Sequence, residues 1–452
     1  MSLHVRESVG AVAEFIVKGT VPEEARTRAL TAFKDTAGVI IAGSAEPAAR
    51  AAQALAVEEG TGRCRVLGTS LQTSAGFAAF SNGIAAHALD YDDMCFVSLA
   101  HPSCALVPAA LAAGELTHAN GAALLDAYVI GFELECRLGN VMNPRHYHQR
   151  GWHCTSSIGT LGAAAAAARV LGLDAYACQH ALGIAASSAC GLKENIGSMV
   201  KPLHAGMAAR NGVMAARLAQ RGVTASPHAI DGPQGYLAAM DSERPSLDFA
   251  VADLGLRWEI VETGVTVKLY PSCAATHPPL DSLIDLQHRE GFTAEQIQAV
   301  DVEVDSMTPR LLIHPDPATG LEAKFSMPFC AAAALVYQRL GIDTFDVEHI
   351  QNPAIQSLMS HVTLRANDTF DQAAPLSRAR VTVRLRDGRT ITQLADGARG
   401  YPGRLTDAEL ATKFAGCVSR TLTSAAAQSA WASLTTFDRM SDVRELTTVL
   451  SA

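Results

Sequence analysis

Histidines and aspartates gather in one short stretch of the chain. The run HALDYDD occupies residues 87–93, and His101 follows it closely. If the stretch is helical, His87, Asp90 and Asp93 share one helical face, because residues three apart are neighbours on a helix. A carboxylate beside an imidazole orients the ring and lets it take or give a proton near neutral pH. The stretch therefore predicts a proton-transfer site, although a polar helix end explains the same spacing.

Three further stretches place basic and aromatic side chains at expected helix starts or at an expected domain boundary. Residues 147–154, YHQRGWHC, precede an alanine-rich helix, whose free backbone N–H groups favour an anion. Lys201 and His204 lie at the expected start of the next long helix. Residues 268–273, KLYPSC, and then His277 lie where the composition changes, and ligands commonly bind in clefts between domains. Each stretch alone is compatible with an ordinary polar loop.

Helices are expected to position most of these residues, up to about residue 260. Apolar periodicity and capping residues predict helices over roughly 22–43, 120–138 and 159–171, from Asp174 onward, and over 204–220. Many of these segments carry alanine and glycine on several faces, which lets helices approach closely. We therefore expect a large helical core in which helices are buried all round.

Strands enter after about residue 265. Residues 299–304 and 381–385 alternate between apolar and polar side chains, and Asp387-Gly388 predicts a tight turn to a strand at 390–392. Helices are expected at about 328–339 and 347–361 between these strands. After Pro402 the chain returns to helix, with a capping box at 406–409 and Ser441 as the cap of a last short helix.

The predicted fold is mainly α. It has a large all-helical domain formed by both chain ends, residues 1–265 plus 397–452, and a smaller α+β domain inserted at residues 266–396.

Composition excludes several classes of function. The net charge is −9 and no long basic stripe is present, so we expect no nucleic-acid partner. The ten cysteines have no metal-type spacing, which disfavours disulfides and an iron–sulfur cluster. No apolar run has the length of a membrane span, and the N-terminal residues do not resemble a signal peptide. We therefore expect a cytoplasmic protein without a membrane partner.

The motifs together, in this order, resemble the landmarks of the MmgE/PrpD family. They are HALDYDD with HPS downstream, GWHxT, KPLHAGMAARNG, KLYPSCAATH and FSMPF, and they cover nearly the whole chain. The resemblance implies a helical domain with a smaller α+β domain, a homodimer and no cofactor. It also implies a small di- or tricarboxylic acid substrate such as 2-methylcitrate, cis-aconitate or iminodisuccinate.

Position within these motifs implies the site residues. The catalytic residues are Asp90, His101, Lys201 and His277, and no metal is implied. The substrate-binding residues are Asp93, Tyr147, His153, His204, Lys268 and His314, the last standing in the place of a family tyrosine. One departure concerns Met94-Cys95, where relatives commonly have threonine and often histidine. A thioether and a thiol are weak hydrogen-bonding groups, so this departure disfavours a leaving hydroxyl held in the family's usual way.

The predicted mechanism begins with removal of a proton next to a carboxylate. His101, backed by Asp90, is the expected base, and Lys201 stabilises the developing negative charge with help from Lys268. His277 then protonates a leaving group or the opposite face of the substrate. Dehydration of the 2-methylcitrate dehydratase type is the leading reaction. Epimerisation of an amino-dicarboxylate such as iminodisuccinate is the first alternative, and decarboxylation of a cis-aconitate-like acid is the second.

Two readings come from other classes of protein. A metal-dependent helical hydrolase would use side chains that are ordinary metal ligands, namely His87, Asp90, Asp93, His101 and His153. A helical binding protein without enzymatic activity would leave these proton-transfer groups without a role. Analysis of bound metal in protein purified without a chelator separates the hydrolase from the other readings.

Overall fold

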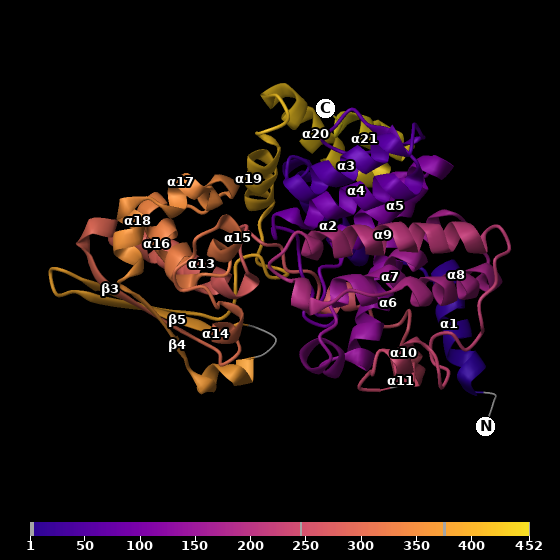
Figure 1. Cartoon of the computed structure of the whole chain (residues 1–452), viewed down its shortest axis with the longest axis horizontal. Helices are drawn as coiled ribbons and strands as arrows, with labels where there is room; N and C mark the ends of the chain where they lie inside the picture. The colour runs from indigo at the N-terminus through magenta and orange to yellow at the C-terminus, as the bar shows by residue number, and fades with distance from the viewer. Residues whose placement is uncertain (1–3, 245, 374–376, 452) are drawn as a thin grey trace. The chain divides into compact units, whose positions relative to one another are not determined.

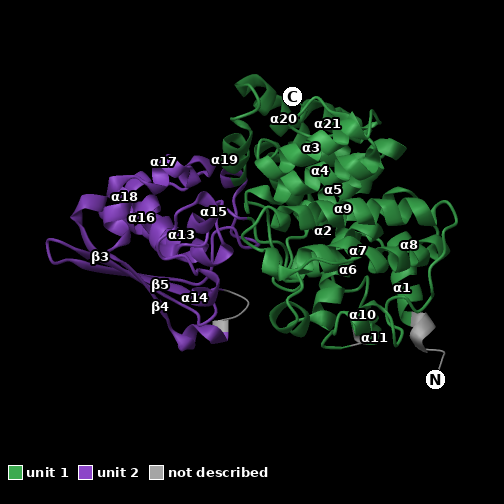
Figure 2. Ribbon diagram, in the orientation of Figure 1, with its two compact units in different colours: residues 1–267, 410–452 green, residues 268–409 purple. Residues whose placement is uncertain are grey.

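The computed structural model describes residues 4–244, 246–373 and 377–451. The chain divides into two compact units, which Figure 2 colours separately. Unit 1 contains residues 1–267 and 410–452, and unit 2 contains residues 268–409. The two segments of unit 1 are therefore separated in sequence by the whole of unit 2. The fold is mainly α, with a small sheet in unit 2.

Unit 1 is a bundle of helices (Figure 1). The longer ones are α1 (His4–Lys18), α2 (Glu23–Gly43), α3 (Pro47–Glu58), α4 (Ala75–Ala88), α5 (Ser103–Thr117), α6 (Gly121–Met142), α7 (Cys154–Val170), α8 (Ala175–Ser188), α9 (Val200–Ala219), α19 (Asp407–Val418, which begins in unit 2) and α20 (Ser424–Thr435). Short helices are η1 (Arg145–Gln149), α10 (Tyr236–Ala239), α11 (Asp248–Val251), α12 (Glu259–Glu262) and α21 (Val443–Val449). A two-stranded ribbon joins β1 (Cys64–Arg65) and β2 (Gln72–Thr73).

Helix α7 forms the centre of unit 1, packed against α5, α6, α8 and α9. Its alanines from 163 to 168 are all buried, as the sequence predicted for a helix covered on every face. Close approach depends on glycine: a Cβ on Gly212 would lie 2.5 Å from that of Ala163, and one on Gly131 would lie 2.7 Å from the Gly162 carbonyl oxygen. Of the helices in the described residues, none combines the length and apolarity needed to cross a bilayer.

Capping residues explain where several helices begin. Asn120 accepts a hydrogen bond from the Ala123 N–H at 2.8 Å, and Asp174 accepts one from the Ala177 N–H at 2.8 Å, both as predicted. The predicted capping box also forms. The Glu409 carboxylate accepts a hydrogen bond from the Thr406 backbone N–H, and the Thr406 hydroxyl oxygen accepts one from the Glu409 backbone N–H. The last helix differs: Asp442, and not Ser441, accepts from the backbone N–H at its start.

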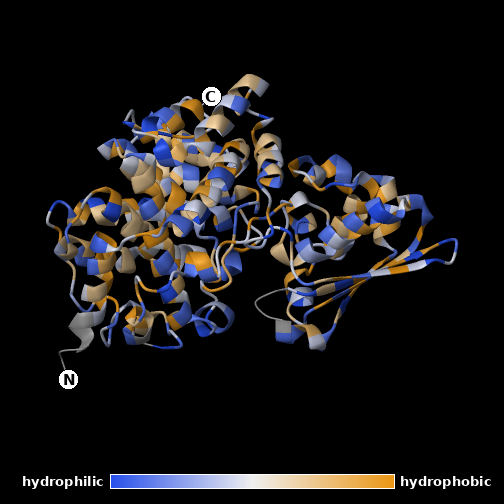
Figure 3. Ribbon diagram, turned by 180° about the vertical axis from the view of Figure 1, so that it is seen from behind, coloured by the Kyte–Doolittle hydropathy of each residue, from blue (hydrophilic) through white to orange (hydrophobic). Residues whose placement is uncertain are grey.

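Unit 2 contains a four-stranded sheet in the order β4-β3-β5-β6. The strands are β3 (Ile297–Val304), β4 (Val362–Ala366), β5 (Ala379–Leu385) and β6 (Thr390–Ala395). The β3–β4 pair is parallel and the other two pairs are antiparallel. Helices α13 (His277–Glu290) and α16 (Met327–Tyr337) pack against the sheet, and α18 (Pro353–Met359) packs against α16 (Figure 1). Figure 3 shows apolar and polar residues along the same strands, as expected when one face is covered.

Three of the four strands agree with the sequence prediction, and one was missed. The predicted helix at 347–361 is instead two short helices, α17 (Val347–Ile350) and α18, because Pro353 begins a new helix. Strand β4 follows them. It was missed although its apolar and polar residues alternate, because the run is only five residues long and directly follows the predicted helix.

Candidate functional site

The HALDYDD run lies at the end of α4 and in the loop that follows. Helix α4 ends at Ala88, and Asp90 has a left-handed backbone with φ of 53°. The predicted common helical face of His87, Asp90 and Asp93 is therefore wrong, because the helix stops before the aspartates. The turn of the loop nevertheless buries these three side chains together with that of Asp92.

Asp92 lies between two histidines. The His87 Nδ1–H donates to Asp92 Oδ2 at 2.7 Å, and His101 Nδ1 lies 3.4 Å from the same oxygen. Burial opposes ionisation, but the two histidines outweigh it and hold the pKa of Asp92 well below its usual range. Burial also lowers the pKa of His87 to about 4, so its ring is neutral at pH 7. The carboxylate beside His101 is thus Asp92, which the sequence prediction left out.

Lys201 and Asp90 form an ion pair across 111 residues of sequence. Lys201 lies in the first turn of α9, and its Nζ is 2.5 Å from Asp90 Oδ1. Their side chains are only 11% and 10% exposed. Asp90, Asp92 and His101 each place one polar atom within 4.8 Å of the others. The buried ammonium of Lys201 is therefore held at the edge of the Asp92–histidine cluster.

His153 and His204 extend the cluster. Their Nδ1 atoms are 3.0 Å apart, so one ring donates to the other. The ring of His153 stacks on that of His87, with centroids 5.7 Å apart, and the rings of His87 and His101 are 4.7 Å apart. Burial, then the charges of neighbouring groups that include Lys201, lowers the pKa of His153 well below its usual value. Burial also lowers the pKa of His204. The structure thus brings four imidazoles into one row.

Asp93 ties the loop to the start of α5 by hydrogen bonds. Its carboxyl accepts from the backbone N–H of Ser103 at 3.3 Å, and the Ser103 hydroxyl bonds both Asp93 and the Tyr128 hydroxyl, the latter at 2.7 Å. Burial, reinforced by the charge of nearby Asp92, raises the pKa of Asp93 well above its usual value. This shift favours the protonated form of the Asp93 carboxyl. Because Ser103 opens α5 two residues after His101 and Asp93 follows Asp92, this network fixes His101 and Asp92 relative to each other.

Tyr147 lies in η1 and is half-buried. Lys193 Nζ lies 3.8 Å from the centroid of the Tyr147 ring and donates to its carbonyl oxygen at 3.2 Å. The face of this ring is therefore occupied by a cation of the same unit.

Three predicted residues belong to unit 2. Lys268 begins the unit and is 2% exposed. His277, also 2% exposed, opens α13, donates from Nε2 to the Ser272 carbonyl at 3.3 Å, and lies against Tyr270 with ring centroids 5.1 Å apart. His314 is half-buried, and its backbone N–H donates to a carbonyl 3.4 Å away. Most residues of the KLYPSCAATH motif, including Lys268, Tyr270 and His277, are therefore buried.

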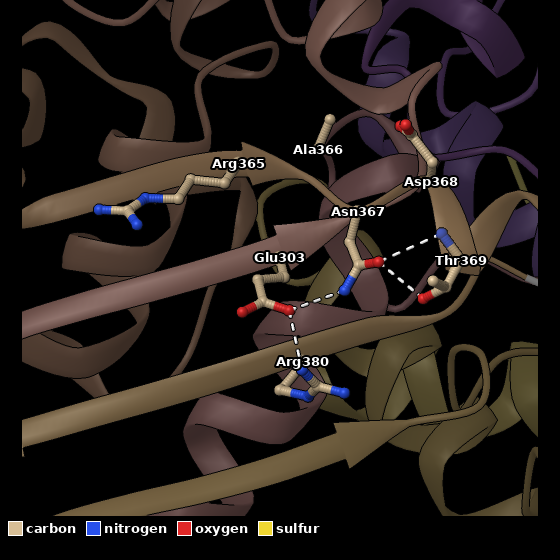
Figure 4. A pocket seen from close by; sticks show the side chains of 7 residues that line it. All are labelled: Glu303, Arg365, Ala366, Asn367, Asp368, Thr369 and Arg380. Atoms are coloured by element: carbon tan, nitrogen blue, oxygen red, sulfur yellow. Dashed lines mark hydrogen bonds and ion pairs between the residues drawn. The ribbon is translucent and has the colours of Figure 1, made fainter.

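A surface pocket of unit 2 has a different character (Figure 4). It lies beside the sheet and is lined by Glu303, Arg365, Ala366, Asn367, Asp368, Thr369 and Arg380. The Glu303 carboxylate accepts from Asn367 at 2.9 Å and from Arg380 at 3.0 Å. Among the residues described around it there is no histidine or lysine, so this pocket offers little for proton transfer at neutral pH.

Among the residues that the structure describes, two sets of side chains bring potential metal ligands close together. They are His87, Asp92 and Cys104, and Asp90, Asp92 and His101. A cation bound by the second set would have to compete with the ammonium of Lys201 for Asp90. A cation bound by the first set would have to displace the proton that His87 shares with Asp92. The contacts present suit proton transfer better than metal binding.

Comparisons with known proteins match both halves of the chain. The MmgE/PrpD N-terminal domain matches residues 11–247, and the MmgE/PrpD C-terminal domain matches residues 270–438. A cis-aconitate decarboxylase-like protein, oryM, of Aspergillus oryzae is 28% identical over 95% of this chain and 94% of its own length. Cis-aconitate decarboxylase of Homo sapiens is 28% identical over 83% of this chain and 79% of its own. That of Aspergillus terreus is 27% identical over 79% and 77%.

Proposed function

The chain belongs to the MmgE/PrpD family, and we propose that it is a lyase that acts on a small di- or tricarboxylic acid. The proposed reaction is decarboxylation of a cis-aconitate-like acid, with side chains and no cofactor moving the proton. The observation that carries this proposal is the buried cluster in which Asp92 is flanked by His87 and His101, beside the Lys201–Asp90 ion pair. The cis-aconitate decarboxylases among its relatives favour the same reaction.

The chemistry requires one acid and one cationic site. In a β,γ-unsaturated acid, the bond to the lost carboxylate breaks, CO₂ leaves, and its electron pair shifts the double bond. The far alkene carbon then takes a proton. Protonated His101 supplies that proton, because ionised Asp92 stabilises its imidazolium form. Lys201 offsets the negative charge that spreads onto the remaining carboxylate during the reaction.

The segment after the aspartates supports decarboxylation over dehydration. Met94 exchanges two backbone hydrogen bonds with Thr266, at 3.0 and 2.8 Å, and Cys95 is completely buried against Cys136. Neither side chain is a good hydrogen-bond donor for a departing hydroxyl group. Decarboxylation needs no such donor, because CO₂ leaves without a proton. Dehydration and epimerisation, predicted first from the sequence, share the proton-transfer step and stay as predictions.

The remaining site residues enter the proposal with narrower roles. We propose Tyr147, His153, His204, Lys268 and His314 as substrate-binding residues and His277 as a second acid or base, from their positions in the family motifs. Asp90 orients Lys201, and Asp93 supports the loop instead of touching the substrate. A homodimer and a cytoplasmic location stay as predictions.

A substrate screen in deuterium oxide tests the proposal. We expect cis-aconitate or a close analogue to release CO₂ and to give a product with one deuterium at the carbon that becomes protonated. Treatment with EDTA should leave the rate unchanged. Loss of water from a hydroxy acid without CO₂ would establish dehydration instead. If no citrate-like or aspartate-like acid reacts or exchanges a proton, the proposed function is wrong.

A further inference from the structure

A second buried ion pair contacts the loop that carries Asp90 and Asp92. Lys413 on α19 has its Nζ 2.6 Å from Asp35 Oδ1 on α2, and the two side chains are 2% and 0% exposed. Lys413 Nζ also donates to the Tyr91 carbonyl oxygen at 2.8 Å and lies 4.1 Å from the centroid of the Tyr91 ring. One ammonium therefore joins α2, α19 and the loop after α4, three segments that are distant in sequence.

The carbonyl group that accepts from Lys413 lies between the two aspartates of the candidate site. Tyr91 lies between Asp90, which pairs with Lys201, and Asp92, which lies between His87 and His101. Its C=O belongs to the peptide that leads into Asp92. Asp90 has a left-handed backbone, which is uncommon for residues other than glycine even though aspartate adopts it more readily than most. A rotation of this peptide would displace both carboxylates.

Stability alone is a weak reason for such a pair. Removing two charges from water is costly, and replacing a buried ion pair with apolar residues is often neutral or stabilising. A buried pair is better explained when it fixes one arrangement among several. Here the ammonium, through its hydrogen bond and its cation–π contact, fixes the backbone and the ring of the same residue.

We propose that Lys413 is a positioning residue of the active site, which holds the Tyr91 carbonyl and thereby fixes Asp90 and Asp92, with Asp35 as its counter-ion. The proposal rests on the proposed function, since it gives Asp90 and Asp92 their use. Charge balance adds a second effect. Asp35 is buried near Asp92, and the ammonium of Lys413 compensates its negative charge, so that Asp92 can stay ionised beside His101.

The test distinguishes a role of Lys413 in positioning the loop from a role in the stability of the fold. Lys413→Met alone leaves Asp35 buried without its counter-ion, so the informative variant is the double substitution Asp35→Leu with Lys413→Met, which removes both charges. Lys413→Arg keeps a cationic donor. Arg137→Met is the matched control, because Arg137 is a buried cation of the same unit whose guanidinium bonds Asp253 and the carbonyls of Ala250 and Arg257 rather than residues of the loop.

We expect the double variant to melt within a few degrees of the wild type, yet to lose roughly 10²-fold in kcat with a much smaller change in KM. Lys413→Arg should recover part of that loss. Amide hydrogen exchange in residues 89–95 should become faster in the double variant, measured well below the melting temperature. Arg137→Met should lower the melting temperature without changing kcat or exchange in this loop.

Two results would overturn the proposal. One is a double variant with wild-type kcat and unchanged exchange in residues 89–95. The other is a kcat that falls only in proportion to the unfolded fraction, which would give Lys413 a purely structural role. Failure of the proposed function looks different, because hydrogen exchange needs no substrate: a loosened loop with unchanged kcat would mean that Asp90 and Asp92 take no part in the reaction.

Discussion

The loop after α4 and the sheet pocket of unit 2 each contain an ion pair between a carboxylate and a basic side chain, but the two pairs differ in burial. In the loop, Asp90 pairs with Lys201, with both side chains nearly buried. In the pocket, Glu303 pairs with Arg380 at 3.0 Å, with side chains 33% and 41% exposed. Water screens the second pair, which reduces its interaction energy. Burial perturbs the pKa values around the first pair, and perturbed groups gathered in one place are typical of active sites.

The largest expected effect concerns His101 and Lys201. His101→Gln should abolish proton transfer, and Lys201→Met should lower turnover by roughly 10²-fold or more, because both groups act on charge that appears in the transition state. The measurement is deuterium incorporation and kcat with the acid found in the screen. A Lys201 variant that loses only apparent affinity would assign the lysine to holding a distant carboxylate.

Asp92 and Asp93 sharpen the comparison within one loop. Asp92→Asn should lower kcat strongly, since the amide cannot stabilise a protonated His101. Asp93→Asn should keep most of the activity, because burial favours the neutral carboxyl and a neutral amide can accept the same hydrogen bond from Ser103. Equal losses in the two variants would contradict the division of roles. Circular dichroism of both variants checks that each is folded.

The pH dependence of stability tests the buried histidines. The pKa of His87 falls from an ordinary value of 6.5 to about 4 on folding, so between these values the unfolded chain binds more protons than the folded one. Stability should therefore rise with pH across this window and fall as the pH drops from 6.5 to 4. For His87 alone the change is about 3 kcal/mol. Urea unfolding midpoints at several pH values measure it.

His87→Gln is the control for this dependence. The variant has no group that titrates at position 87, so its stability should change less steeply between pH 4 and 6.5 than that of the wild type. Buried His146, whose pKa is also lowered to about 4, and His153 leave some slope in the variant. An unchanged slope would show that His87 is not buried in a neutral form.

Local signals in the sequence predicted most of the helices. Asn120 and Asp174 act as caps within one turn, and the alanine run of α7 carries its burial in its own composition. The residue types of the HALDYDD run likewise indicated proton transfer. The pairing of Asp92 with His101 could not be predicted, because it depends on the left-handed turn at Asp90 where helical spacing no longer applies.

Contacts between residues distant in sequence were even harder to predict. Lys413 and Tyr91 are 322 residues apart, and nothing near Lys413 distinguishes it from a lysine on a helix surface. Ser103 and Tyr128 are ordinary helical residues until folding places Asp93 between α5 and α6. These groups are recognised by burial and by shared partners, which are properties of the folded chain.

The smallest expected effect concerns the pocket of unit 2. Arg380→Met removes one cation from a half-exposed pair, so the free energy of unfolding should change by about 1 kcal/mol or less. Raising the salt concentration should reduce even this difference, because screening weakens the pair in the wild type. Turnover should stay unchanged. Urea unfolding at low and high salt, together with kcat, measures both effects. A large loss of turnover in Arg380→Met would break the comparison between the two regions, since it would give the exposed pair a functional role that its burial does not explain.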